Sequence, residues 1–211
     1  MALHACRDCA KSELDRGRRM FLSTACCLGA ALTLGGPHSL AQGRKDDSTD
    51  ALLKTEARIA LALMRFREGF HCSQSVLEAY AADFGLEAEL ARRMAAALAG
   101  GSTVGGECGV VGSGYLVLGL KYAGFRPAHG DVEREDQLWS RVRRFLAEFK
   151  KRHGAITCRE LLGVDAFTKE GRAEALRKGL FVTRCPKYIQ GGIEILDSLD
   201  RLVPEPESAK I

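Results

Sequence analysis

The sequence predicts an all-α protein, a compact multi-helix bundle with a glycine-rich central helix. Three observations support this fold class. Apolar residues recur with a period near 3.6 in successive stretches, and few stretches alternate with the period of 2 that is typical of strands. Neither a strand series nor an internal repeat is visible. Apolar residues make up 46% of the 211 residues and charged residues 27%, which is the balance of one folded domain rather than of a disordered chain.

Residues 1–41 are typical of a twin-arginine-type signal peptide. Arg18 and Arg19 precede an apolar stretch at 24–34 and a small-residue end at 39–41, which is the order of basic region, apolar core and cleavage site in an export signal. The apolar stretch is shorter than the roughly 20 residues of a membrane span. We therefore expect a periplasmic or otherwise exported protein, carried by the twin-arginine pathway, with no stable membrane span after signal cleavage.

The residues after this leader divide into three parts. The polar stretch 42–49 predicts a flexible linker, the four-cysteine helical redox domain is expected over 50–204, and 205–211 form a disordered tail. Within the domain, apolar periodicity predicts three helices that end at a glycine or before a glycine-rich connection. They cover about 50–68, 73–84 and 87–98.

The next element is the predicted centre of the bundle. A glycine-rich connection at 100–106 leads into an apolar run at 110–122 that also contains glycines. This run is too short for a confident membrane span, so we expect a buried central helix whose glycines let neighbouring helices pack closely. Further helices are expected at 132–152, 158–162, 170–178 and 186–202. Basic and acidic residues alternate over 133–151, so the net charge of +4 indicates a solvated face and no nucleic-acid surface.

The candidate site consists of the four cysteines that follow the predicted signal peptide, Cys72, Cys108, Cys158 and Cys185. Their spacing excludes the local signatures of a zinc ribbon, a c-type haem and a thioredoxin-like motif. Each lies at or near the predicted N-terminus of a helix, where exposed N–H groups and the helix dipole lower the pKa of a thiol. If the four helix starts converge, they form a pocket for a thiolate-bound metal or cluster. Two ordinary disulfides are the alternative in an exported protein.

Three other residues lie beside these cysteines in the sequence. His71 precedes Cys72, and we interpret it as a cap or surface residue, with a ligand or proton donor as the alternative. Arg159 and Lys187 each lie within two residues of a cysteine. Their positive charges could help to hold a thiolate.

The residues around the cysteines carry a resemblance to a known family. The matching stretches are HCSQSVL at 71–77, GECG at 106–109 with LGLKY at 118–122, CRELLG at 158–163, and CP at 185–186. Together they resemble the C_GCAxxG_C_C family of redox-active proteins over about residues 59–199. That family is defined by four cysteines in this order and a CGAxxG motif around the second. The resemblance implies a redox-active site of four cysteines and no particular substrate.

Two residues depart from the family motif. Val110 stands at its alanine position and Ser113 at its last glycine position, so the backbone path after Cys108 is expected to differ slightly.

Three functions compete at this point. In the first, Cys72, Cys108, Cys158 and Cys185 bind an iron–sulfur cluster for electron transfer, with zinc or no cofactor as alternatives; twin-arginine export favours it because a cluster must be inserted before transport. The second is thiol–disulfide exchange between cysteine pairs. The third is a helical domain held by disulfides with a structural role. We expect a redox partner protein and no nucleic acid, and a homodimer is compatible with the sequence. Whether the protein is an enzyme stays open.

Overall fold

Helix α1 (Asp47–Arg67) opens the part of the chain that this computed structural model describes, residues 47–123 and 132–202. The helix begins inside the stretch predicted as a linker, because the polar residues 47–49 form its first turn. The predicted signal peptide 1–41, residues 42–46 of the predicted linker and the predicted tail 205–211 lie outside the described residues.

The next helices follow the predicted boundaries closely. Helix α2 (Cys72–Ala81) continues into the short turn η1 (Ala82–Phe84), and α3 (Ala88–Ala95) continues into η2 (Ala96–Leu98). Gly85 ends η1 in a left-handed conformation with φ of 63°, which glycine adopts without steric cost. Both predicted helices are therefore confirmed, each with a tighter last turn.

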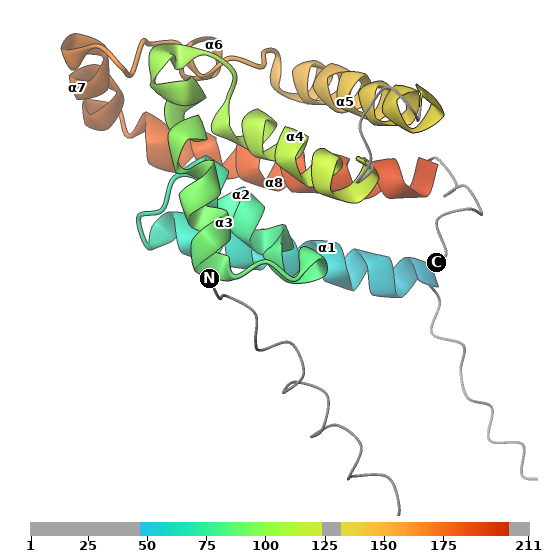
Figure 1. Ribbon diagram of the computed structural model, residues 1–211. Coiled ribbons are helices and arrows are strands. Elements are labelled where there is room, and N and C mark those ends of the chain that lie inside the picture. Colours follow the sequence, from blue (N-terminus) through green and yellow to red (C-terminus); the bar gives the residue numbers. More distant parts are fainter. Residues whose placement is uncertain (1–46, 124–131, 203–211) are drawn as a thin grey trace, which may run out of the picture. The chain divides into compact units, whose positions relative to one another are not determined.

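Helix α4 (Gly109–Tyr122) is the buried central helix that the sequence predicts. It contacts α2, α5 and α8 (Figure 1). Its glycines lie at these contacts: a Cβ at Gly114 would overlap the ring of Phe145 on α5, and a Cβ at Gly112 would lie 3.3 Å from Leu98. Close packing of the neighbours therefore depends on glycine at both positions.

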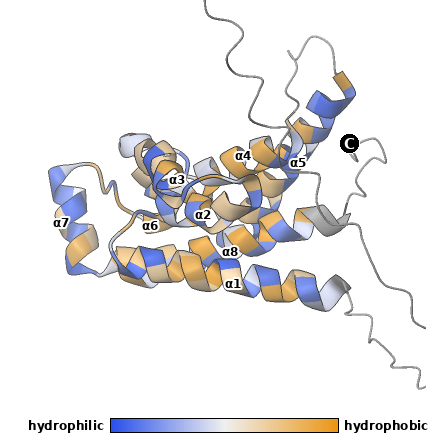
Figure 2. Ribbon diagram, turned by 60° about the horizontal axis from the view of Figure 1, so that its bottom comes forward, coloured by the Kyte–Doolittle hydropathy of each residue, from blue (hydrophilic) through white to orange (hydrophobic). Residues whose placement is uncertain are grey.

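The C-terminal half contains four helices, α5 (Val132–His153), α6 (Cys158–Leu162), α7 (Lys169–Arg177) and α8 (Leu180–Leu202). Threonine side chains cap two of them, because Thr157 Oγ1 accepts the N–H of Glu160 and Thr168 Oγ1 accepts the N–H of Gly171. Figure 2 shows apolar and polar residues interleaved along α1 and α8, as expected for helices with one buried face.

The predicted start of the last helix was wrong. Helix α8 begins at Leu180 rather than near Pro186, so Pro186 lies inside the helix instead of at its first position. The physical reason is that Leu180 and Cys185 are buried together in one apolar cluster. Burial of this extra turn outweighs the preference of proline for a helix start.

A buried polar network joins α1, α2 and α8. The carboxylate of Asp197 accepts hydrogen bonds from Tyr80 Oη and Thr55 Oγ1, each at 2.8 Å, and pairs with Arg58 at 2.8 Å. Each buried oxygen of Asp197 therefore has a partner, which burial of a charge requires.

Strands and membrane helices are missing from the described parts of the chain. Residues 47–123 and 132–202 contain no strand beyond one isolated bridge between Glu107 and Thr157. No described helix is long and apolar enough to cross a membrane. The all-α fold class is thus confirmed.

Candidate functional site

Cys72 is the first residue of α2, as predicted. The chain enters the helix through His71, whose backbone is extended and whose N–H donates to Gln74 Oε1 at 3.0 Å. His71 thus serves at the helix cap, in agreement with its first interpretation. The sulfur of Cys72 is partly buried, and a Cβ built on Gly109 of α4 would lie 2.9 Å from it. Glycine after Cys108 is therefore needed for the close approach of α4 to this thiol.

Cys108 and Cys158 begin helices α4 and α6 on two segments that are hydrogen-bonded to each other. The N–H of Cys108 donates to the carbonyl of Ile156 at 2.8 Å, and the N–H of Cys158 donates to the carbonyl of Gly106 at 2.7 Å. These two bonds flank the isolated bridge between the segments. Both thiols are buried, at 4% and 8% exposure. Tertiary hydrogen bonds thus hold the two helix starts together.

Cys185 does not lie at a helix start. The prediction that it lies near the N-terminus of a helix was therefore wrong. It lies in the second turn of α8, with 8% of its surface exposed. Its thiol therefore does not point toward the free N–H groups that a helix start would provide. Instead it is buried in an apolar cluster that also contains Cys158.

Cys72 and Cys108 form a hydrogen-bonded pair of thiols. The side-chain hydrogen bond from Cys108 has the largest effect on the pKa of Cys72 and lowers it; the backbone N–H groups of Ser73 and Gly100 lower it further, against the effect of burial. The same bond raises the pKa of Cys108 well above its ordinary value, together with burial and the charge of Cys72. Of the two thiols, Cys72 is therefore the one that loses its proton more readily, and Cys108 is the one that keeps it.

The other two thiols stay neutral at ordinary pH. Burial, followed by the charges of Cys72 and Asp165, raises the pKa of Cys158 to about 12. Burial, followed by the charges of Cys72 and Cys158, raises the pKa of Cys185 as well. The charge of Cys72 thus acts on all three other cysteines, so these three thiols lie within electrostatic range of it. All four are thiols here, without a disulfide among them.

A left-handed loop covers Cys72. Positive φ angles occur at five of its residues, namely Gly100, Gly101, Ser102, Thr103 and Gly105. This conformation turns the N–H of Gly100 toward the Cys72 sulfur. The glycine-rich stretch was predicted only as a connection, since a sequence does not reveal which thiol a loop amide meets. Left-handed Ser102 and Thr103 cost energy, which the surrounding contacts must offset.

Arg159 and Phe167 hold this loop in place. Arg159 donates to the carbonyl of Val104 at 3.2 Å and pairs with Asp165 at 2.8 Å. The ring of Phe167 fills the space that a Cβ on Gly100 would occupy. Arg159 therefore acts on the loop above Cys72 rather than directly on a thiolate. Lys187 is exposed, and a charge-holding role for it stays a prediction.

The two departures from the family motif are accommodated inside α4. Ser113 is fully buried, and its hydroxyl donates to the carbonyl of Ser73 at 2.7 Å, next to Cys72. Val110 is also fully buried, and it packs where a Cβ on Gly192 of α8 would stand. The helix continues through both positions, and whether its backbone path differs from that of the family stays a prediction.

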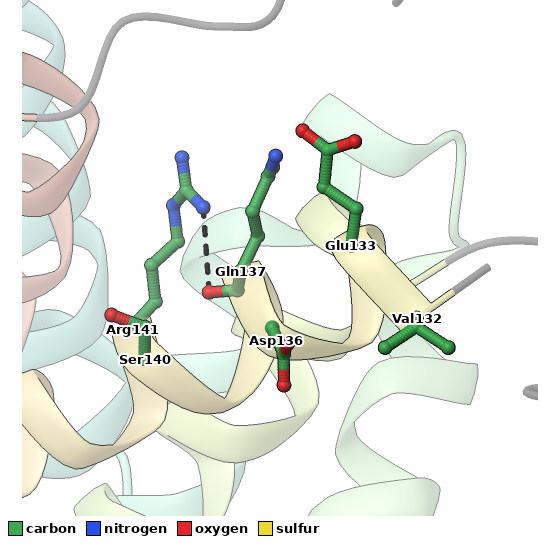
Figure 3. Close-up of a pocket in the computed structure, with 6 residues that line it drawn as sticks. All are labelled: Val132, Glu133, Asp136, Gln137, Ser140 and Arg141. Carbon is green, nitrogen blue, oxygen red and sulfur yellow. Dashed lines mark hydrogen bonds between the residues drawn. The ribbon is translucent and has the colours of Figure 1, made fainter.

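The residues of the site do not form a ready metal site. Within 47–123 and 132–202, no three His, Cys, Asp or Glu side chains are grouped as a metal ion would require. A pocket of about 600 Å³ does occur on α5, and Figure 3 shows its lining of Val132, Glu133, Asp136, Gln137, Ser140 and Arg141. None of the four cysteines lines that pocket. The chemistry of the described site is therefore that of its thiols.

A comparison with known proteins also points to the cysteines. The model of one protein family, described as "Putative redox-active protein (C_GCAxxG_C_C)", matches residues 70–199. The match begins two residues before Cys72 and extends past Cys185. Searches of curated proteins and of solved structures found no match.

Proposed function

The chain belongs to the C_GCAxxG_C_C family, and we propose that it is a dithiol redox protein in which Cys72 and Cys108 cycle between two thiols and one disulfide. The observation that carries this proposal is the close approach of the segment that bears Cys108 to the Cys72 side chain. A Cβ on Gly109, the residue after Cys108, would lie 2.9 Å from the Cys72 sulfur, and the side-chain interaction of the two thiols lowers the pKa of Cys72. Thiol–disulfide exchange needs an attacking thiolate and a second sulfur within reach, and the pair supplies both. As a residue, Cys72 is only half-buried, whereas the other three cysteines are buried.

The reaction with a partner disulfide takes two steps. The Cys72 thiolate attacks one sulfur of the partner, a mixed disulfide forms, and the other partner sulfur leaves as a thiolate. Cys108 then loses its proton to the leaving thiolate or to water and attacks the Cys72 sulfur, which releases the second partner thiolate. The partner gains two electrons, and the chain loses two as its new disulfide forms. The same steps in reverse oxidise a partner dithiol.

Three features of the chain support distinct roles for the two thiols. The N–H groups of Ser73 and Gly100 stabilise negative charge on Cys72, which makes it the nucleophile and a good leaving group. The Cys108 sulfur is buried and protonated, so it stays unreactive until a mixed disulfide removes the charge beside it. Gly109 allows α4 to bring Cys108 this close to Cys72.

An iron–sulfur cluster bound by Cys72, Cys108, Cys158 and Cys185 is the second candidate. The gathering of the four thiols around the charge of Cys72 favours it, because thiolates are the usual ligands of such clusters. As they lie, however, the side chains do not fit a metal ion or cluster. We therefore derive no step through a cluster, and the same holds for zinc.

Export by the twin-arginine pathway belongs to the proposal. It rests on Arg18, Arg19 and the apolar stretch that follows them. The double substitution Arg18→Lys and Arg19→Lys should stop export in a bacterium that has this pathway, because the paired arginines are the recognition signal. Fractionation of cells would then find the protein in the cytoplasm. Unchanged periplasmic protein would contradict the proposal.

One preparation separates the candidate functions. Protein purified without oxygen should be colourless, and brief, mild oxidation that is quenched at once should remove two alkylatable thiols, mapped to Cys72 and Cys108 by mass spectrometry. Cys72→Ser should abolish this reaction, whereas Cys185→Ser should leave it intact. A brown protein with stoichiometric iron and sulfide would support the cluster instead. Reduction that alters only thermal stability would support a structural disulfide.

A further inference from the structure

Cys158 and Cys185 lie together behind the reactive pair. Both are buried in one apolar cluster, whose other members are Leu162, Ala166, Ala175 and Leu180. Cys158 comes from α6 and Cys185 from α8, two helices in contact with each other. The charge of Cys158, when ionised, raises the pKa of Cys185, which indicates that the two sulfurs lie within electrostatic range. The proposed reaction of Cys72 and Cys108 uses neither thiol.

This buried pair is connected to the reactive pair through Cys108. The backbone bonds of Cys108 to Ile156 and of Cys158 to Gly106 hold the two cysteine-bearing segments side by side. The charge of Cys158 contributes to the raised pKa of Cys108. Partly buried Phe66 packs against both apolar clusters, so no solvent layer has to be crossed between them. The Cys108 thiol thus lies within electrostatic range of two other thiols, those of Cys72 and Cys158.

We propose that Cys158 and Cys185 are a second dithiol, which takes over by intramolecular exchange the disulfide that forms between Cys72 and Cys108. This inference rests on the proposed function of the first pair. It adds two catalytic thiols and a defined order in which the four cysteines react. A partner would then oxidise Cys72 and Cys108, and the resulting disulfide would move to the buried residues Cys158 and Cys185.

The exchange is balanced within the chain. Cys158 loses its proton and attacks the Cys108 sulfur of the Cys72–Cys108 disulfide, and Cys72 leaves as a thiolate. Cys185 then loses its proton and attacks the Cys158 sulfur, which releases Cys108 as a thiolate. Cys108 and, in part, Cys72 take up the two protons. The Cys158–Cys185 pair is oxidised by two electrons, and the Cys72–Cys108 pair is reduced by two, without an outside reagent.

The environments of the two pairs give this exchange a direction. Reduced Cys72 is stabilised by the N–H groups of Ser73 and Gly100 and by Cys108. A dithiol whose reduced form is stabilised in this way has a more oxidising disulfide. For Cys158 and Cys185, in contrast, burial has the largest effect on the thiol pKa and raises it, so their thiolates are not stabilised in this way. The disulfide should therefore settle on Cys158 and Cys185, and Cys72 should return to its reactive form.

Residue-resolved disulfide mapping over time tests the exchange. Fully reduced exported protein, from which the predicted signal peptide 1–41 and its four cysteines have been removed, is mixed with one equivalent of oxidised glutathione, quenched with acid at intervals, alkylated and digested. We expect the Cys72–Cys108 disulfide first and the Cys158–Cys185 disulfide at equilibrium. In Cys185→Ala, the disulfide should stay on Cys72–Cys108 or on the intermediate Cys108–Cys158. Leu180→Val is the matched control, since it alters the same cluster and keeps all four thiols.

The outcomes separate this inference from the function on which it rests. A stable Cys72–Cys108 disulfide with Cys158 and Cys185 still alkylatable at equilibrium overturns the exchange and leaves the first proposal standing. If no Cys72–Cys108 disulfide forms at any time, in the wild type or in Cys185→Ala, the proposed function itself is wrong. Circular dichroism of Cys185→Ala verifies that the variant is folded, and Cys158→Ala provides a second variant with the same expected block.

Discussion

Replacement of Cys108 by alanine should weaken the thiolate of Cys72. The substitution Cys108→Ala removes the S–H group whose hydrogen bond is the largest cause of the lowered Cys72 pKa. A hydrogen bond to a charged group contributes about 1.5–3 kcal/mol, and S–H is a weak donor, so we take the lower end. About 1.4 kcal/mol corresponds to a tenfold change in an equilibrium constant. The ratio of thiolate to thiol at Cys72 should fall by about tenfold at any given pH.

The assay is the pH profile of alkylation at Cys72, read by mass spectrometry of the Cys72 peptide. The half-maximal rate should move to higher pH in Cys108→Ala. The N–H groups of Ser73 and Gly100 remain in the variant, but burial, which raises the Cys72 pKa, then becomes the largest single effect. Cys185→Ala is the control, since Cys185 is not hydrogen-bonded to Cys72, and its profile should match the wild type. An unchanged profile in Cys108→Ala would refute the assignment of the two roles.

Three further predictions concern the surroundings of the site. Arg159→Ala should move the Cys72 alkylation profile to higher pH, because the loop that carries the Gly100 N–H loses its hydrogen bond at Val104. Arg159→Lys should restore part of the wild-type profile. Thermal unfolding should change little, because the ion pair between Arg159 and Asp165 is half-exposed. Asp197→Ala should destabilise the fold by about 3 kcal/mol in urea unfolding, since it removes the buried carboxylate that accepts from Tyr80 and pairs with Arg58. A loss below 1 kcal/mol would contradict that reasoning. Burial lowers the pKa of His153 in the folded protein, so the unfolded chain binds a proton at this imidazole more readily. The free energy of unfolding should therefore decline as the pH falls below about 6.5. His153→Phe should flatten that decline.

Local sequence signals predicted most of the helices and three of the four cysteine positions. Helical periodicity, glycine stops and the Thr157–Glu160 cap depend on residues close together in the chain, so the starts of α2, α4 and α6 agree with expectation. Cys185 was misplaced because Pro186 resembles a helix start. The burial of Leu180, which extends α8 past the proline, depends on residues far away in the sequence.

The pairing of the thiols could not be read from the sequence. The bond between Cys72 and Cys108 joins residues 36 positions apart and depends on the crossing of α2 and α4. One signal did point to it: glycine directly after Cys108 permits close approach of another group, and that group is the Cys72 sulfur. The roles of Arg159 and Phe167 in holding the loop had no comparable signal, since each contacts residues more than 50 positions away.

The central claim is that Cys72 and Cys108 are the redox-active pair. The most direct measurement is residue-resolved alkylation of protein purified without oxygen, before and shortly after the addition of one equivalent of a disulfide oxidant. Our account predicts that Cys72 is the first thiol alkylated before oxidation, and that the first disulfide joins Cys72 to Cys108. A first disulfide between any other cysteines, or thiols already occupied by iron and sulfide, would contradict it.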